Sequence, residues 1–191
     1  MTRNLVLFGM MGAGKSTVAT VVAERLGREV VDTDREVERL SGRRVAEIFA
    51  ADGEAGFRRR ERLAVEQVAR RADRVVSVGG GAVLDDRNVE CLRSSGVLVE
   101  LRAPVHVLVA RLEGDSANSG EADVARPLLD GADLADRVAE LAALRGERYD
   151  AVADHVVDAD ASPVDVADAV LVWAVTAPGV LSDAELGRVM W

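Results

Sequence analysis

The stretch LVLFGMMGAGKS, residues 5–16, decides the fold of this chain of 191 residues. Its first four residues form a continuous apolar run, which is typical of a strand buried on both faces of a parallel sheet. Residues 9–16 then match G-x-x-x-x-G-K-S, the phosphate-binding loop that joins a strand to a helix. We expect backbone N–H groups and the start of the next helix to converge on a phosphate group here. An ordinary glycine-rich turn is the alternative.

Lys15 is the only lysine among the 24 basic residues. In a chain that otherwise uses arginine, one lysine indicates a position that needs a compact point charge on a flexible stem. We expect its ammonium group to reach the β- and γ-phosphates of a nucleotide, and the Ser16 hydroxyl to bind Mg²⁺.

The overall composition excludes several classes of protein. A hydrophobic content of 49% and a charged content of 30% indicate a globular domain rather than a disordered chain or a membrane protein. The net charge of −9 argues against sequence-independent binding of nucleic acid, which needs a basic surface. One cysteine, Cys91, and the absence of a signal-peptide pattern predict a cytoplasmic protein with no membrane contact. We expect it to be a monomer.

Short apolar runs alternate with helical patterns along the chain. Strands are expected at residues 5–8, 29–32, 75–78, 97–101 and 155–157. Helices are expected at residues 15–26, 34–40, 45–50, 54–71, 86–93, 104–112, 134–148 and 163–175, with a short one after 182. This alternation predicts a three-layer α/β/α fold with a central parallel sheet. Ligands of such sheets bind beyond the carboxyl ends of the strands, where residues 9–16, 32–34 and 79–81 would meet.

Two segments interrupt the alternation. Residues 113–125 are polar, small and aperiodic, and they predict a mobile loop. With the sequence RPLL at 126–129 that follows it, this loop would form a lid over about residues 113–129. Residues 1–175 are expected to form one domain. Residues 176–191 would be a tail of unknown role that packs on the surface or binds a partner.

Two acidic residues follow the second predicted strand. Asp32 and Asp34 are two positions apart, so their carboxylates share a face if the strand continues. Beside a nucleotide, one can hold a metal ion through water while the other orients or deprotonates an attacking hydroxyl. Aspartate at a strand end is also a frequent helix N-cap, which leaves a purely structural interpretation open.

Arginines and a second glycine cluster are further candidate binding groups. In FRRRE, residues 57–61, at most one or two arginines can enter a site, because consecutive helical residues point in different directions. An inward arginine would grip a carboxylate or phosphate, whereas an outward one pairs with a glutamate at helical spacing. The glycines at 79–81 allow backbone N–H groups to approach a ligand, or form a plain turn. Arg126 would either swing in to neutralise transition-state charge or stay exposed.

The order and spacing of these motifs resemble the shikimate kinase family over most of the chain. The resemblance is carried by Asp32-Thr33-Asp34, Phe57-Arg58-Arg59-Arg60-Glu61, Gly79-Gly80-Gly81-Ala82, Arg126-Pro127-Leu128-Leu129, and Arg145 four residues before Tyr149. It implies a P-loop kinase fold like that of nucleoside monophosphate kinases, with a mobile lid. The implied reaction transfers the γ-phosphate of ATP to the 3-hydroxyl of shikimate, with Mg²⁺ as cofactor, on the route to chorismate and the aromatic amino acids.

The resemblance also implies a role for each matched residue. Asp34 would contact the shikimate hydroxyls as base or orienting group, and Arg58 and Arg145 would bind the carboxylate, in a pocket lined by Gly79, Gly80 and Gly81. ATP would be bound by residues of the phosphate loop, a later helix and the lid: Gly12, Ala13, Gly14, Lys15, Ser16, Thr17, Arg111 and Arg126. Ser16 and Asp32 would hold magnesium. Lys15, Asp34 and Arg126 would act in catalysis.

Two other functions compete with this interpretation. A related small-molecule kinase would act on gluconate or a nucleoside monophosphate. A nucleotide acceptor needs a base-binding pocket, however, and gluconate lacks the rigid ring that suits a glycine-lined site. A module that binds nucleotide without catalysis would not need Asp34 or Arg58, yet both positions hold the required residue types.

Overall fold

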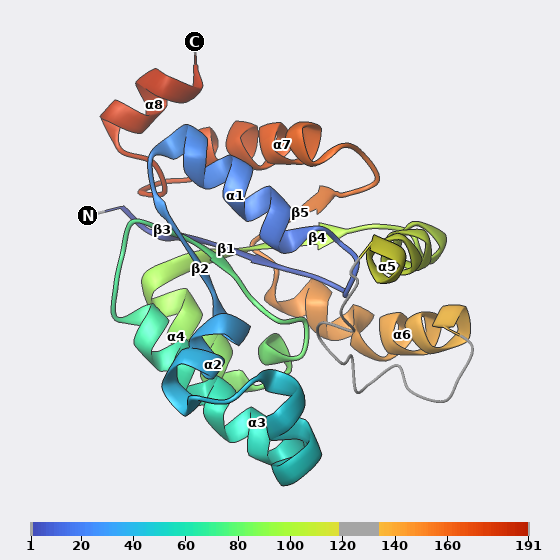
Figure 1. Ribbon diagram of the computed structural model, residues 1–191. Coiled ribbons are helices and arrows are strands. Elements are labelled where there is room, and N and C mark those ends of the chain that lie inside the picture. Colours follow the sequence, from blue (N-terminus) through green and yellow to red (C-terminus); the bar gives the residue numbers. More distant parts are fainter. Residues whose placement is uncertain (1, 119–133, 191) are drawn as a thin grey trace.

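The computed structural model describes residues 2–118 and 134–190, which form a parallel sheet covered by helices on both faces (Figure 1). The strands are β1 (Asn4–Phe8), β2 (Glu29–Asp32), β3 (Arg74–Ser77), β4 (Gly96–Arg102) and β5 (His155–Asp158). They lie in the order β2-β3-β1-β4-β5, and every neighbouring pair is parallel. The three-layer fold predicted from the sequence is therefore confirmed.

The helices follow the predicted alternation. Within the described residues they are α1 (Lys15–Leu26), α2 (Thr33–Ser41), α3 (Val45–Ala69), α4 (Asp86–Ser95), α5 (Val105–Asn118), α6 (Leu134–Val152), α7 (Pro163–Thr176) and α8 (Asp183–Val189), with a short 3-10 helix η1 (Ala82–Leu84). In Figure 1, α1 and α7 cover one face of the sheet, and α4 and α6 lie on the other. None of the helices in this part of the chain combines the length and the apolar character that crossing a membrane requires.

The break expected between residues 50 and 54 is confirmed: α3 contains a kink at Gly53, whose φ of 66° and ψ of −177° are not helical. The end of α5 differs from the sequence prediction. α5 continues to Asn118, so the predicted loop from residue 113 begins as helix. Extending an existing helix costs far less than starting one, so even a polar sequence can add a turn to it. The rest of the predicted lid, including Arg126, lies outside the described residues.

The position of β1 in the sheet places the phosphate loop. β1 pairs with β3 on one side and with β4 on the other, which makes it the central strand. All five of its residues are buried, as expected for a strand covered on both faces. The loop that follows Phe8 therefore starts from the middle of the carboxyl edge of the sheet, between the ends of β3 and β4.

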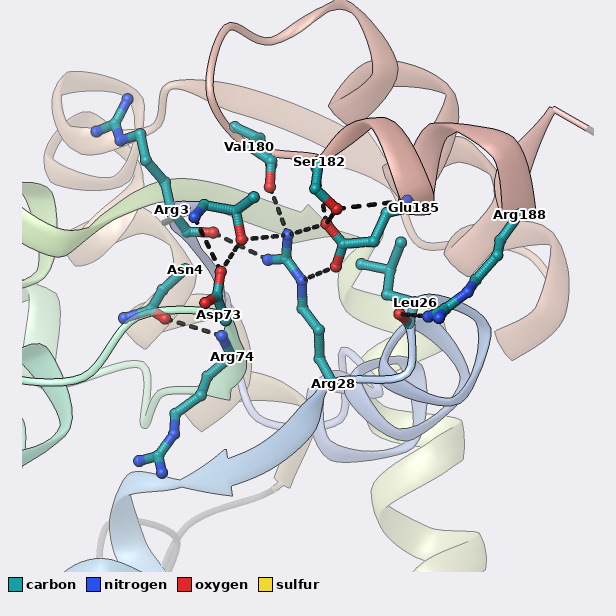
Figure 2. Close-up of polar contacts among 11 residues, drawn as sticks. Arg3, Asn4, Leu26, Arg28, Asp73, Arg74, Val180, Ser182, Glu185 and Arg188 are labelled. Atoms are coloured by element: carbon teal, nitrogen blue, oxygen red, sulfur yellow. Dashed lines mark hydrogen bonds and ion pairs between the residues drawn. The ribbon is translucent and has the colours of Figure 1, made fainter.

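The tail after α7 packs onto the domain through one buried arginine (Figure 2). The side chain of Arg28, between α1 and β2, is only 2% exposed. Its guanidinium donates to both carboxylate oxygens of Glu185 in α8, at 2.6 and 3.1 Å. It also donates to the carbonyl oxygens of Arg3 and Val180, which come from the start of β1 and from the tail. Arg28 thus joins the two ends of the chain.

The surroundings of Glu185 keep it ionised. Burial raises its pKa, but hydrogen bonds from Arg28 and from the backbone and hydroxyl of Ser182 outweigh burial and lower the pKa to about 2. A carboxyl group with a lowered pKa stabilises the folded state above its ordinary pKa, here 4.5. That contribution is lost as the pH falls from 4.5 towards 2.

We expect Glu185→Ala to lower the free energy of unfolding at pH 7 by about 2–4 kcal/mol, because it leaves the Arg28 guanidinium buried without its counterion. The difference from the unsubstituted chain should shrink as the pH falls from 4.5 towards 2. Urea denaturation over this pH range measures both effects. Asp183→Ala removes an exposed carboxylate from the same helix and is the control. Equal losses in the two variants would contradict the importance of the Arg28–Glu185 pair.

Candidate active site

The phosphate loop runs from the end of β1 to the first residue of α1. Gly12 and Gly14 have φ values of 80° and 83°, a left-handed conformation that favours glycine. A Cβ atom at Gly12 would also lie 2.7 Å from the carbonyl oxygen of Leu108, so this position has no room for a side chain. The Lys15 ammonium spans the loop and donates to the Met10 carbonyl at 2.9 Å. Because Gly14 caps α1, the positive end of the helix dipole faces the loop.

A cavity of about 420 Å³ opens on one side of this loop. One wall consists of residues 12–17, and the other includes Arg111 from α5 and the segment that follows β5. Arg111 donates to the carbonyl oxygens of Ala159 and Ala161, at 2.8 and 3.1 Å, and so joins α5 to that segment. The structure thus brings together all the predicted nucleotide-binding residues that it describes. Arg126 is not among the described residues.

A second cavity, of about 270 Å³, opens beyond the same loop. Its lining combines acidic, basic, aromatic and glycine residues: Asp32, Asp34, Glu61, Lys15, Arg58, Arg145, Phe49, Phe57, Gly79, Gly80 and Gly81. The two cavities share Gly12, Lys15 and Ser16 in their linings, so the phosphate loop lies between them. A phosphate group bound on the loop would therefore face both cavities.

Asp32 takes the structural role that the sequence left open, and its second oxygen faces the phosphate loop. Its Oδ1 accepts hydrogen bonds from the N–H groups of Asp34 and Arg35, which makes it the N-cap of α2. Its Oδ2 accepts from the Ser16 hydroxyl at 3.0 Å. β2 ends at Asp32, so the condition under which the two carboxylates would share a strand face is not met. Both carboxylates still line the second cavity, since α2 begins at once and its first turn carries Asp34.

Asp34 carries the unsatisfied polar atom of this cavity. Its Oδ1 is buried and has no hydrogen-bond partner within the described part of the chain. Burial raises the pKa of Asp34 to about 6, and the charge of Asp32 adds to this rise, whereas the charges of Lys15 and Arg58 oppose it. A buried oxygen without a partner is costly, so a hydroxyl group of a ligand would satisfy Asp34.

Arg58 is the arginine of its run that lines the second cavity, and a buried glutamate holds it there. Its Nη1 donates to both oxygens of Glu61, at 3.0 and 2.8 Å, while Nε and Nη2 donate to the more exposed Glu54. Glu61 is 1% exposed, so burial raises its pKa, and the Arg58 charge partly offsets the rise. The guanidinium lies so close to Gly81 that a Cβ atom there would collide with it.

Sequence reasoning did not single out Glu61 as part of the site. Its three-residue spacing from Arg58 indicated a helical ion pair, which is usually solvent-exposed. The missing information was burial, because that spacing is the same for an exposed pair and for a pair at the wall of a cavity.

Arg145 reaches the second cavity from α6. The residue is only 7% exposed, and no carboxylate of the described residues forms an ion pair with it. Its Nη1 lies 3.5 Å from the position that a Cβ atom on Gly80 would occupy. A buried guanidinium without a counterion favours an anionic ligand. The structure therefore brings Asp34, Arg58 and Arg145 to one cavity, as the resemblance implied.

Comparisons with known proteins identify the family. The family model described as shikimate kinase matches residues 11–174. The chain belongs to the shikimate kinase family. A shikimate kinase of Symbiobacterium thermophilum is 48% identical over 153 residues, which cover 80% of this chain and 84% of that protein. A shikimate kinase of Pelotomaculum thermopropionicum is 41% identical over 165 residues, which cover 86% of this chain and 91% of that protein.

A solved structure agrees with the family assignment. The shikimate kinase of Acinetobacter baumannii, in complex with shikimate, is similar with a TM-score of 0.83 and 33% sequence identity. The similarity covers 92% of this chain and 94% of that chain. The match to the shikimate kinase family model ends at residue 174, so the tail that packs through Glu185 lies beyond it.

Proposed function

We propose that the chain transfers the γ-phosphoryl group of ATP to the 3-hydroxyl of shikimate. One observation carries the proposal: the unpartnered oxygen of Asp34 lies in a cavity that also holds Arg58 and Arg145. Shikimate is a cyclic acid with several hydroxyls, so it offers a hydroxyl to the carboxylate and a carboxylate to the guanidinium groups. Because Lys15 borders both cavities, the transferred group can pass between them at its ammonium.

ATP occupies the larger cavity in this proposal. The N–H groups of residues 12–17 and the start of α1 hold the phosphates, and the Lys15 ammonium lies on the β- and γ-phosphates. Arg111, fixed to the Ala159 and Ala161 carbonyls, flanks the adenine. The role of Arg126 on a closing lid stays a prediction from the sequence. So does the expectation that the enzyme is a monomer.

Mg²⁺ fits the oxygen donors at the boundary between the cavities. Ser16 Oγ and Asp32 Oδ2 are 3.0 Å apart, and Mg²⁺ favours such hard donors, completed by phosphate oxygens and water. Ser16 and Asp32 would hold the ion, which supplies positive charge to the β- and γ-phosphates when it is bound.

Asp34 directs the acceptor hydroxyl. It accepts the hydrogen bond of the 3-hydroxyl and takes the proton as the hydroxyl oxygen bonds to the γ-phosphorus and the bond to ADP breaks. Arg58 and Arg145 bind the shikimate carboxylate, which fixes the ring against the glycines at 79–81. Phosphoryl transfer depends mainly on such positioning and on charge neutralisation, and both are available at this site.

An assay of ADP release with different acceptors tests the substrate. With ATP and Mg²⁺ we expect turnover with shikimate and none with gluconate or nucleoside monophosphates, because neither presents a ring carboxylate and hydroxyls in the required arrangement. Turnover with gluconate or a nucleotide but not with shikimate would replace the proposal by one of those kinase activities. ATP binding without turnover on any acceptor would favour a non-catalytic nucleotide-binding module.

We expect Asp34→Asn to lower kcat by about 10²–10⁴-fold, because the amide cannot take the proton of the attacking hydroxyl. The dissociation constant of ATP, measured by calorimetry, should change little, since Asp34 does not line the nucleotide cavity. Asp183→Asn makes the same chemical change at an exposed position and is the control. A variant that keeps its full kcat would show that Asp34 is neither base nor orienting group.

We expect Arg58→Ala to raise KM for shikimate by about 10–100-fold, because it removes charged hydrogen bonds to the substrate carboxylate. KM for ATP should stay unchanged. Arg59→Ala removes the next, exposed arginine of the same helix and is the matched control for loss of charge. Identical shikimate kinetics in the two variants would rule out Arg58 as a carboxylate ligand.

A further inference from the structure

Tyr149, the only tyrosine of the chain, lies behind the second cavity, called the acceptor cavity below because it receives shikimate in the proposed function. The residue is 2% exposed and does not line the cavity itself. Its hydroxyl nevertheless donates to the carbonyl oxygen of Gly80 at 2.9 Å, and Gly80 does line the cavity. The proposed reaction gives Tyr149 no role of its own, so its contacts need a separate explanation.

Arg145 lies beside the phenolic oxygen: the position that a Cβ atom on Gly80 would occupy is 2.5 Å from the Tyr149 hydroxyl and 3.5 Å from Arg145 Nη1. The two residues are four positions apart in α6, so they lie on the same face of the helix. Burial raises the pKa of Tyr149, and the charge and hydrogen bond of Arg145 lower it. A hydroxyl has one proton to donate and two lone pairs, so it can donate to Gly80 and accept from Arg145 at once. Tyr149 therefore links two parts of the cavity wall.

Tyr149 is an uncharged partner for Arg145, and this affects the charge that Arg145 can offer to a substrate. A glutamate in the place of Tyr149 would hold the Arg145 guanidinium but would also place a negative charge beside it, as Glu61 does beside Arg58. A phenol fixes the orientation of the guanidinium and leaves its positive charge available. Since no carboxylate of the described residues forms an ion pair with Arg145, that charge remains for the substrate.

The tyrosine ring is itself held by the strand that carries the phosphate loop. Phe8, fully buried at the end of β1, meets the ring edge-on, with centroids 5.3 Å apart and planes at 88°. Gly80 fits tightly between the tyrosine and the phosphate loop, because a Cβ atom there would lie 2.5 Å from the Tyr149 hydroxyl and 2.7 Å from the Gly9 carbonyl oxygen. Tyr149 is therefore fixed relative to the start of the phosphate loop.

We infer that Tyr149 is a positioning residue for the phosphoryl acceptor: its hydroxyl holds the Arg145 guanidinium and the Gly80 backbone in the arrangement that receives the substrate carboxylate. The inference rests on the proposed function, since it takes shikimate as the acceptor. It concerns the orientation of Arg145 alone and leaves the chemistry at Asp34 unaffected. Loss of the hydroxyl should therefore change acceptor binding far more than the chemical step or nucleotide binding.

Tyr149→Phe tests the inference, because it removes the hydroxyl and keeps the ring against Phe8. We expect KM for shikimate to rise about 10-fold, from the loss of a hydrogen bond to a charged group. KM for ATP and kcat should each stay within about twofold of the values for the unsubstituted chain. The loss of an interaction made only in the transition state would lower kcat by much more. Thr176→Val removes a hydroxyl that donates to a backbone carbonyl at the end of α7, and it should leave all three constants unchanged.

The route of the effect is tested in an Arg145→Ala background. If Tyr149 acts through Arg145, Tyr149→Phe should raise KM for shikimate far less there than in the unsubstituted chain. An equal rise in both backgrounds, an unchanged KM for shikimate, or parallel changes in both KM values and the melting temperature would overturn the inference. Turnover of shikimate by the unsubstituted chain is measured first, so failure of the proposed function is recognised separately.

Discussion

Lys15 lines two cavities at once, and the rest of the site depends on that position. β1 fixes the start of the loop because it is the buried central strand, and Gly14 fixes the end as the N-cap of α1. Between these points the backbone at Gly9 and Gly12 packs so tightly that a Cβ atom has no room there. The phosphoryl donor and the phosphoryl acceptor can then approach Lys15 from two sides. The reaction between them then depends mainly on how the protein positions them.

The acceptor cavity consists of groups that are costly to bury. An unpartnered oxygen of Asp34, the Arg58–Glu61 pair and the Arg145 guanidinium gather on its wall, and the pKa of Asp34 is raised by its burial. None of these groups is expected to stabilise the empty protein much, since even a paired buried charge repays its desolvation only in part. Such an arrangement is understandable if a substrate supplies the missing partners. Stability must come from elsewhere, namely the apolar core around the sheet.

The sequence was sufficient for the fold and for most of the residues that meet at the site. Periodicity and the glycine-rich loop predicted the alternation of strands and helices along the chain and the edge at which the motifs gather, because both are local signals of backbone geometry. The structural and the metal-binding interpretation of Asp32 could not be separated from sequence, since one carboxylate has two oxygens, of which one caps α2 and the other accepts from Ser16. The site contacts of Glu61 and Tyr149 depend on burial, which local spacing does not report. The contact between Arg28 and Glu185 joins positions far apart in the chain, and no local pattern connects them.

The central claim is that one cavity holds the nucleotide and the other holds the acceptor, with Lys15 between them. A crystal structure of the protein with shikimate and ADP tests it most directly. We expect the shikimate carboxylate on Arg58 and Arg145, its 3-hydroxyl on Asp34, and that hydroxyl directed across Lys15 towards the terminal phosphate of ADP. Shikimate bound elsewhere, or bound with its carboxylate away from both arginines, would contradict the claim.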